Sequence, residues 1–198
     1  GTGRLGPVAP TASYAGNMVV NRYIPAGATN WRMMGSSVSG QTVNNWKDDF
    51  YTAGFPGSHS PNFASPQGSG ILWPSIRWYN EANAGPAVID GLSGATNTAQ
   101  ALAAGQGFAA WCGTGFAAAT AFSVDITGAP GVASTPIALP VRDANAGVPA
   151  TDGWNMVANP LPSPIAFDQI SRGANVEDYI TYFDPATGNN ATWDISMG

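Results

Sequence analysis

Residues 153–168, GWNMVANPLPSPIAFD, decide how the rest of the chain is interpreted. From Trp154 to Asn159 successive side chains point to opposite sides of the backbone, which is the two-residue period of a β-strand. The prolines from Pro160 to Pro164 then end the strand, because proline has no N–H to donate to a ladder and has a fixed φ. We therefore predict a buried strand over Trp154–Ala158, followed by a rigid extended corner and a return to the core.

Similar short segments recur along the chain, separated by turns rich in Gly and Pro. With 154–158 they complete a set of about nine predicted strands, at residues 17–24, 30–34, 71–79, 107–112, 119–127, 136–142, 178–183 and 191–195. Many short strands between such turns indicate an all-β fold, and we predict a β-sandwich of the jelly-roll type. Residues 82–104 are predicted to be a loop with one helical turn at 99–104.

One short helix and one hairpin turn complete the predicted elements. Val43, Trp46 and Phe50 have the i, i+3, i+7 spacing of a helix face, so we expect two or three helical turns within Ser39–Tyr51. Asp184–Gly188 is predicted to be a hairpin turn whose glycine takes a positive φ. The Gly/Pro-rich residues 1–16 are predicted to form an N-terminal arm, and residues 17–198 a single β-sandwich domain.

Composition excludes several classes of function. Charged residues make up 10% of the chain, against about 25% in an average soluble domain. The net charge of −5 and the pI of 4.4 argue against a nucleic-acid partner. The single Cys112 excludes an internal disulfide and a cysteine-based metal site, and the chain has no apolar run long enough to span a membrane. No signal peptide is visible, so a secreted chain would already be mature.

The stretch from Gly153 also carries a resemblance. It resembles the GWNLVGNPYPSPI segment of large secreted surface proteins of Bacteroidota, many of them exported by the type IX secretion system. Three further stretches match the same pattern in the same order, at residues 22–46, 105–108 and 182–188. The resemblance implies a secreted, extracellular or cell-surface protein without an assigned reaction. The C-terminal sorting domain of that family is not seen here, which would suit a processed product or a shorter relative. The motif positions are Gly153, Trp154, Asn155, Asn159, Pro160 and Pro164.

No constellation of residues predicts catalysis, a cofactor or a metal. Gly105–Ala110 satisfies G-x-G-x-x-[GA], but a strand-like stretch follows it instead of a helix, so a tight turn is expected. His59 is the only histidine and is interpreted as a loop residue. The adjacent acids Asp48–Asp49 and Glu177–Asp178 are expected on solvated faces or at a helix end. Loops with Asp and Asn leave calcium open, but no D-x-D-x-D-G loop is present.

These observations favour a structural protein over an enzyme. We predict a non-enzymatic subunit of a surface filament, sheath or adhesive layer, which binds copies of itself by strand or arm exchange and has no cofactor. A sparsely charged surface offers little repulsion between packed neighbours. The arm would add a strand to a neighbouring sheet edge, with Gly3, Leu5 and Val8 as its contact residues.

The alternative is a carbohydrate-binding module of a surface glycan-binding or glycan-degrading protein. It would require exposed aromatic rings on one face, for which we predict Trp73, Trp78 and Tyr79. Most of the seven tryptophans are expected in the core.

Overall fold

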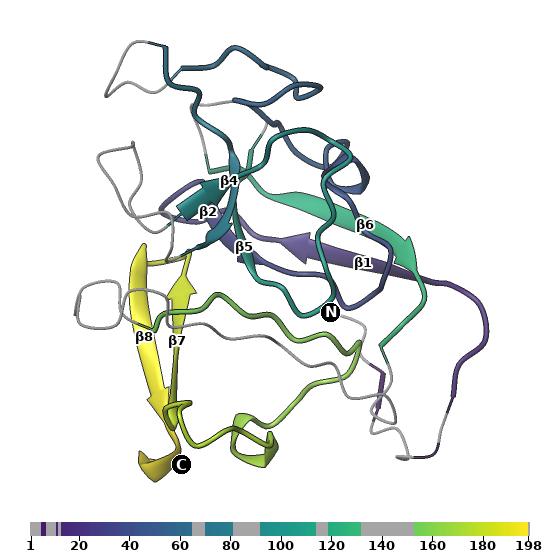
Figure 1. The fold of residues 1–198 in the computed structure, drawn as a ribbon, viewed down its shortest axis with the longest axis vertical. Helices are drawn as coiled ribbons and strands as arrows, with labels where there is room; N and C mark the ends of the chain where they lie inside the picture. Colours follow the sequence, from purple (N-terminus) through teal and green to yellow (C-terminus); the bar gives the residue numbers. More distant parts are fainter. Residues whose placement is uncertain are drawn as a thin grey trace.

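The computed structural model describes residues 5–6, 11, 13–64, 70–80, 92–113, 119–131 and 153–197. Within these ranges the chain is predominantly antiparallel β-structure with three short 3-10 turns, and its eight strands form three sheets (Figure 1). This confirms the all-β prediction at the level of strand content. No helix in the described ranges has the length and apolar character needed to cross a membrane. The predicted strand at 136–142 lies outside the described residues.

The longest pairing joins β1 (Met18–Ile24) to β6 (Phe122–Gly128), which lie side by side in Figure 1. The two strands are antiparallel in an unbroken register that runs from Met18 opposite Gly128 to Ile24 opposite Phe122. On β6 the even-numbered residues Val124 and Ile126 are buried and the odd-numbered ones are exposed, as strand alternation requires. Both strands lie where the sequence predicts them.

A four-stranded sheet has the order β2-β5-β3-β4. Its strands are β2 (Trp31–Met34), β5 (Phe108–Trp111), β3 (Ile76–Tyr79) and β4 (Leu92–Gly94). β1 and β2 follow one another in the chain but belong to different sheets, because β2 pairs with β5. β4 corrects the prediction of a loop over this part of 82–104, since three residues of weak strand character are paired with Arg77–Tyr79.

The third sheet is the hairpin of β7 (Tyr179–Asp184) and β8 (Asn189–Asp194). Its turn confirms the prediction for Asp184–Gly188, with Gly188 at φ 75°. The Asp184 side chain organises the turn, because its Oδ1 accepts the N–H of Ala186 at 2.9 Å. The hairpin is the lowest left part of Figure 1.

The predicted helix is wrong in length. In place of two or three turns there is a single 3-10 turn at Val43–Asn45. Two backbone amides at its start donate to carbonyls of the segment 98–100 of the same chain, from Val43 to Gln100 and from Asn44 to Thr98. The side chain of Asn45 accepts the N–H of Thr42 at 2.9 Å and so caps the start of the turn. The helix does not continue, because the amide of Tyr51 donates to the carbonyl of Gly113 at 3.2 Å. The apolar spacing itself is correct, because Val43, Trp46 and Phe50 are all buried.

The predicted buried strand at Trp154–Ala158 is also wrong. Trp154 is 44% exposed, and the segment makes one isolated bridge, between Val157 and Gln106. The prolines that follow prevent a longer ladder, and the Gly105–Gly107 partner is short. Alternating residues therefore predict an extended chain but not its burial.

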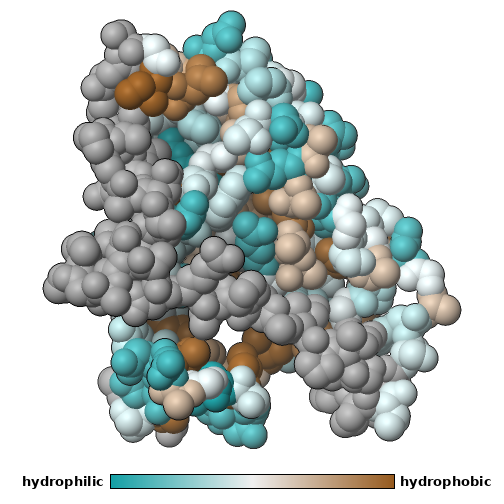
Figure 2. Space-filling view, in the orientation of Figure 1, coloured by the Kyte–Doolittle hydropathy of each residue, from teal (hydrophilic) through white to brown (hydrophobic). Residues whose placement is uncertain are grey.

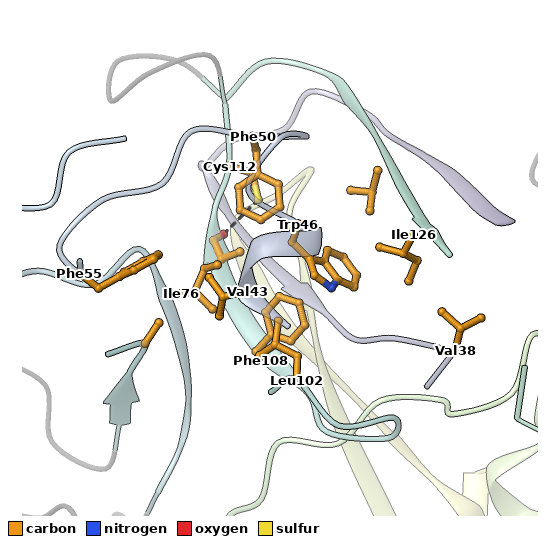
Figure 3. Packing of buried hydrophobic residues seen from close by; sticks show 13 residues of the cluster. Val38, Val43, Trp46, Phe50, Phe55, Ile76, Leu102, Phe108, Cys112 and Ile126 are labelled. Atoms are coloured by element: carbon orange, nitrogen blue, oxygen red, sulfur yellow. Dashed lines mark hydrogen bonds between the residues drawn. The ribbon is translucent and has the colours of Figure 1, made fainter. Parts of the chain in front are cut away.

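The core lies between the β1–β6 pair, the four-stranded sheet and residues 43–50 (Figure 3). β6 contributes Val124 and Ile126, and the edge of the Trp46 ring meets Phe108 with ring centroids 5.1 Å apart. The other buried members of the cluster are Val38, Val43, Phe50, Phe55, Ile76, Ala95, Leu102, Ala110 and Cys112.

Candidate functional site

Of the three contact residues predicted for the N-terminal arm, the structure describes one, Leu5. Gly3 and Val8 lie outside the described residues. Leu5 is half-buried, and its N–H donates to the carbonyl of Pro162 in the same chain at 3.4 Å. At Leu5 the arm therefore contacts residue Pro162 of the same chain. An arm that folds back in this way cannot bind a neighbouring subunit at the same time.

The predicted aromatic platform is not assembled on one face. Trp78 packs against the core cluster, whereas its strand neighbour Tyr79 points to the opposite side of β3. Trp73 is half-buried and stacks on the guanidinium of Arg77, whose carbon lies 4.0 Å from the ring centroid. Strand alternation therefore separates the rings that adjacency in the sequence groups together.

Arg77 forms the centre of an aromatic ladder that sequence reasoning missed. Its guanidinium lies between Trp73 and Trp31, and the edge of Trp31 meets Trp111. Arg77 is 4% exposed, its Nε donates to the carbonyl of Pro74 at 2.6 Å, and burial lowers its pKa to about 10. No carboxylate neutralises it among the described residues, so the two indole faces and one carbonyl compensate the buried charge only in part, and Nη2 is buried without a hydrogen-bond partner there.

Arg32 is the second buried arginine and fastens the loop before β2. It is 3% exposed and donates to three backbone carbonyls, at 3.1 Å to Trp31, at 3.3 Å to Pro25, and to Thr29. Burial lowers the pKa of its guanidinium. The arginine therefore holds residues 25–31 against the start of β2.

The four stretches that carry the sequence resemblance meet in pairs. The amide of Gly107 donates to Met156 at 3.1 Å and that of Ala158 to Gly105 at 2.9 Å, so the glycine turn pairs with the 153–159 stretch. The amide of Ala28 donates to the carbonyl of Pro185 at 2.7 Å, so the stretch 22–46 contacts the stretch 182–188. Gly105 has φ 81° and β5 begins at Phe108, so the turn prediction for this string is confirmed.

Asn159 explains how the proline corner is held. Its Oδ1 accepts the amide of Leu161 at 2.9 Å, and its Nδ2 donates to the carbonyl of Ser163 at 2.8 Å. One side chain thus fixes the backbone of residues 160–163 through two hydrogen bonds. Gly153 takes φ 67°, Asn155 donates to its carbonyl at 2.8 Å, and Pro164 is exposed. These motif positions shape the backbone and contribute no reactive group.

His59 lies beside two shallow hollows. One of about 290 Å³ is lined by residues 59–63, and one of about 260 Å³ by Asn44, Lys47, Asp48 and His59. The ring stacks on Tyr51, and its Nδ1 accepts the amide of Thr52 at 3.1 Å. Among the described residues, the hydroxyl at hydrogen-bond distance from that nitrogen belongs to Thr52, which is fully buried, so this arrangement presents no accessible nucleophile there. In the described part of the chain, no group of three metal-binding side chains is present.

Asp49 meets an acid from a distant strand. Its Oδ2 accepts the amide of Asp125 on β6 at 3.1 Å, although the two residues are 76 positions apart. Partial burial, with Asp125 and Asp48 nearby, raises the pKa of Asp49 to about 7. Neither Asp49 nor Asp125 lines one of the two hollows. In the other predicted acid pair, Glu177–Asp178, the carboxylate of Asp178 accepts a hydrogen bond from Arg172 at 2.9 Å.

The contact from Asp49 identifies a difference between the two edges of the β1–β6 pair. The amide of Asp125 points away from β1, and so does the carbonyl of Thr127, which accepts the side-chain amide of Gln41 at 2.9 Å. The amide of Ser39 donates to Ala129 at 2.9 Å just beyond the strand. The outer edge of β6 is therefore occupied by other parts of the chain.

The outer edge of β1 is open within the part of the chain that the structure describes. Residues directly opposite in an antiparallel ladder either both face their partner or both face away. Asn21 is opposite Asp125 and Val19 is opposite Thr127, so their backbone groups face outward, and by alternation so do those of Tyr23. None of these groups has a hydrogen-bond partner among the described residues. Val19 is 65% exposed and Tyr23 is 64% exposed.

Comparison with protein-family models, curated proteins and solved structures finds no match to this chain.

Proposed function

We propose that this chain is a non-enzymatic structural protein of the cell surface, a subunit of a filament, sheath or adhesive layer. The observation that carries the proposal is the open edge of β1, a seven-residue strand whose outward backbone groups have no partner in the described structure. Such an edge binds an extended strand through main-chain hydrogen bonds. The extracellular location rests on the resemblance to secreted surface proteins.

The surface supports close packing of neighbouring subunits. With 10% charged residues, few ionic groups must be desolvated or brought near like charges when copies associate. Figure 2 shows that much of the visible described face is pale, of intermediate hydropathy, with strongly apolar residues in small separate areas. This pattern suits contacts made by backbone pairing more than contacts made by one large apolar patch.

We also propose the β-sandwich as the architecture of the subunit. The arrangement of the core supports it, because side chains of the β1–β6 pair and of the four-stranded sheet meet in one cluster. Val124 and Ile126 enter from one side, and Phe108 and Ile76 from the other. A jelly-roll connection of the strands remains part of the same proposal.

Light scattering over a range of protein concentrations tests the proposed function. We expect the intact chain to associate as its concentration rises. A chain lacking residues 1–12 tests arm exchange, which requires that the shortened chain stay folded and monomeric. An intact chain that remains monomeric at high concentration would contradict the proposed function.

A second candidate function, glycan binding, is favoured by one exposed aromatic pair. Trp154 is 44% exposed and Tyr179 is 40% exposed, with ring centroids 6.5 Å apart. On the same face as Tyr179, the hydroxyls of Thr181 and Thr192 lie 3.0 Å apart and offer hydrogen bonds to a sugar. The proposed sugar contacts are then Trp154 and Tyr179, whose ring planes are inclined by 65°, in place of a platform of Trp73, Trp78 and Tyr79.

A glycan array tests this second candidate. We expect binding by the intact chain that is lost in Trp154→Ala and kept in Tyr14→Ala, a matched loss of an exposed ring elsewhere. Absence of binding by the intact chain, or equal binding by both variants, would refute the sugar platform.

A further inference from the structure

We infer that the open edge of β1 binds the same edge of a second copy of this chain, antiparallel, with Asn21 opposite Asn21 of that copy. The two β1–β6 pairs would then form one continuous four-stranded sheet in the order β6-β1-β1-β6. This inference rests on the proposed function and specifies which edge and which partner it uses. The two-fold contact closes on itself, so it forms a dimer that a larger assembly joins through a further surface.

The first step is that the edge of β1 carries few of the features that protect strand edges. Natural edge strands avoid pairing through charged residues, above all lysine, and through proline, bulges or a covering segment, and β1 has a single charged residue, Arg22. Residues 18–24 contain neither lysine nor proline, and the register with β6 is unbroken. The opposite edge of the same pair is protected, by the Asp49 carboxylate and the Gln41 amide.

The second step is the kind of partner that fits. The unpaired groups belong to alternate residues, Val19, Asn21 and Tyr23, which is the spacing of an antiparallel ladder. The partner must therefore be an extended strand that presents its own outward groups at the same spacing. Pro25 ends the available edge directly after β1.

The third step is that β1 is complementary to itself. With Asn21 opposite Asn21, each Val19 is opposite a Tyr23, which gives two favourable pairs of a β-branched and an aromatic residue. Each of these pairs joins residues whose backbone groups point outward, so each exchanges two hydrogen bonds.

Charge also favours this register. Arg22 is the only charged residue of β1, and it would be opposite Val20 of the second copy. A register shifted to bring the two Arg22 side chains opposite each other would oppose like charges and would pair only residues 20–24 of the strand. The register centred on Asn21 therefore avoids direct repulsion and aligns the whole strand.

The test uses a charge swap at the centre of the contact. In Asn21→Lys, two lysines face each other only if β1 pairs with β1 in this register, and the same holds for two glutamates in Asn21→Glu. We expect the dissociation constant from sedimentation velocity to rise about fivefold or more in each variant alone. An equal mixture of the two variants should restore association to at least the wild-type level.

Thr127→Lys is the matched control, since Thr127 is exposed on the same face but on β6, away from the open edge. It should associate like wild type, and equal thermal midpoints would show that all variants fold alike.

The outcomes separate the inference from the proposed function. A wild-type chain that is monomeric at every concentration overturns both. If Asn21→Lys associates with itself as strongly as wild type does, the inference is overturned, and self-assembly must use another surface. Weakening in both charge variants without restoration in the mixture overturns the two-fold register, because the edge then binds a different segment.

Discussion

Arg77 is a buried charged residue that has no acidic side chain as its partner among the described residues. Its guanidinium is buried between two indoles, and the pKa of about 10 leaves it protonated at neutral pH. Flat aromatic faces attract a planar cation and also exclude water from it. The packing of this side chain should therefore matter more to stability than its charge.

We predict that Arg77→Ala lowers the free energy of unfolding by about 2–5 kcal/mol, because it opens a gap between Trp31 and Trp73. Arg77→Met should cost less than about 1.5 kcal/mol, since it refills most of that volume. Urea denaturation measures both, with Arg22→Ala on exposed β1 as the control. Equal losses for Met and Ala would show that the charge, not the packing, is what stabilises the site.

Asp49 predicts a dependence of stability on pH. The pKa of its carboxyl is about 7 in the folded chain against an ordinary 3.8, so the folded chain binds the extra proton between these values. Stability at this site is therefore highest at low pH and falls as pH rises from about 4 to about 7. Partial exposure of the carboxyl reduces the size of the effect.

Asp49→Asn keeps an acceptor for the Asp125 amide and removes the charge. We expect its thermal midpoint to exceed that of wild type by about 2–4 °C at pH 8 and to match wild type at acid pH. Asp48→Asn, on the exposed neighbour, should not reproduce the gain. A wild-type midpoint that rises from pH 5 to pH 8 by an amount removed in Asp49→Asn would show the opposite sign.

Among the elements, the β7–β8 hairpin depends on a glycine outside it. A side-chain carbon on Gly27 would lie 2.1 Å from the carbonyl oxygen of Pro185, in the hairpin turn. The amide of Ala28 bonds to the same carbonyl, so this close approach holds the hairpin to the loop before β2.

We predict that Gly27→Ala costs about 1–3 kcal/mol of stability and loosens the hairpin before the core. In the variant, the rate of hydrogen exchange should increase over that of wild type more for amides of β7 and β8 than for amides of β5 and β6. Gly173→Ala is the control, since a side-chain carbon there meets nothing within 4 Å. Uniformly faster exchange over the whole chain would contradict a local role for Gly27.

The elements also show what periodicity can predict. β1, β6 and the β7–β8 hairpin lie within a few residues of their predicted positions, because each alternates over six or seven residues between clear turns. The predictions for 39–51 and 154–158 are wrong for different reasons. At 39–51 the apolar spacing is correct, but the amide of Tyr51 bonds to Gly113 in place of the helical carbonyl. At 154–158 the alternation does not predict burial, because the only ladder partner in the described structure is a short glycine turn and Trp154 is exposed.

For the whole molecule, the low charge content predicts the salt dependence of assembly. Ions screen exposed charges beyond about 10 Å at 0.1 M salt, so contacts that rely on charge weaken as salt rises. With 12 acidic and 7 basic residues in 198, backbone pairing should dominate association.

We therefore expect the dissociation constant of self-association to change less than about twofold between about 0.05 M and about 0.5 M NaCl. Sedimentation velocity at both concentrations measures it, with Thr127→Lys as a variant of altered charge. A tenfold or larger change would point to an electrostatic contact in place of strand pairing.

The sequence by itself determined the strand content, the hairpin turn and the low surface charge, because these follow from local alternation, turn chemistry and composition. It did not determine which edges are open. Asp49 reaches β6 from a position 76 residues earlier, and that contact distinguishes the protected edge from the open one. In the same way, the indole of Trp31 meets the Arg77 guanidinium from a position 46 residues earlier. Local sequence sets the period of a strand, but only packing in three dimensions decides what lies against it.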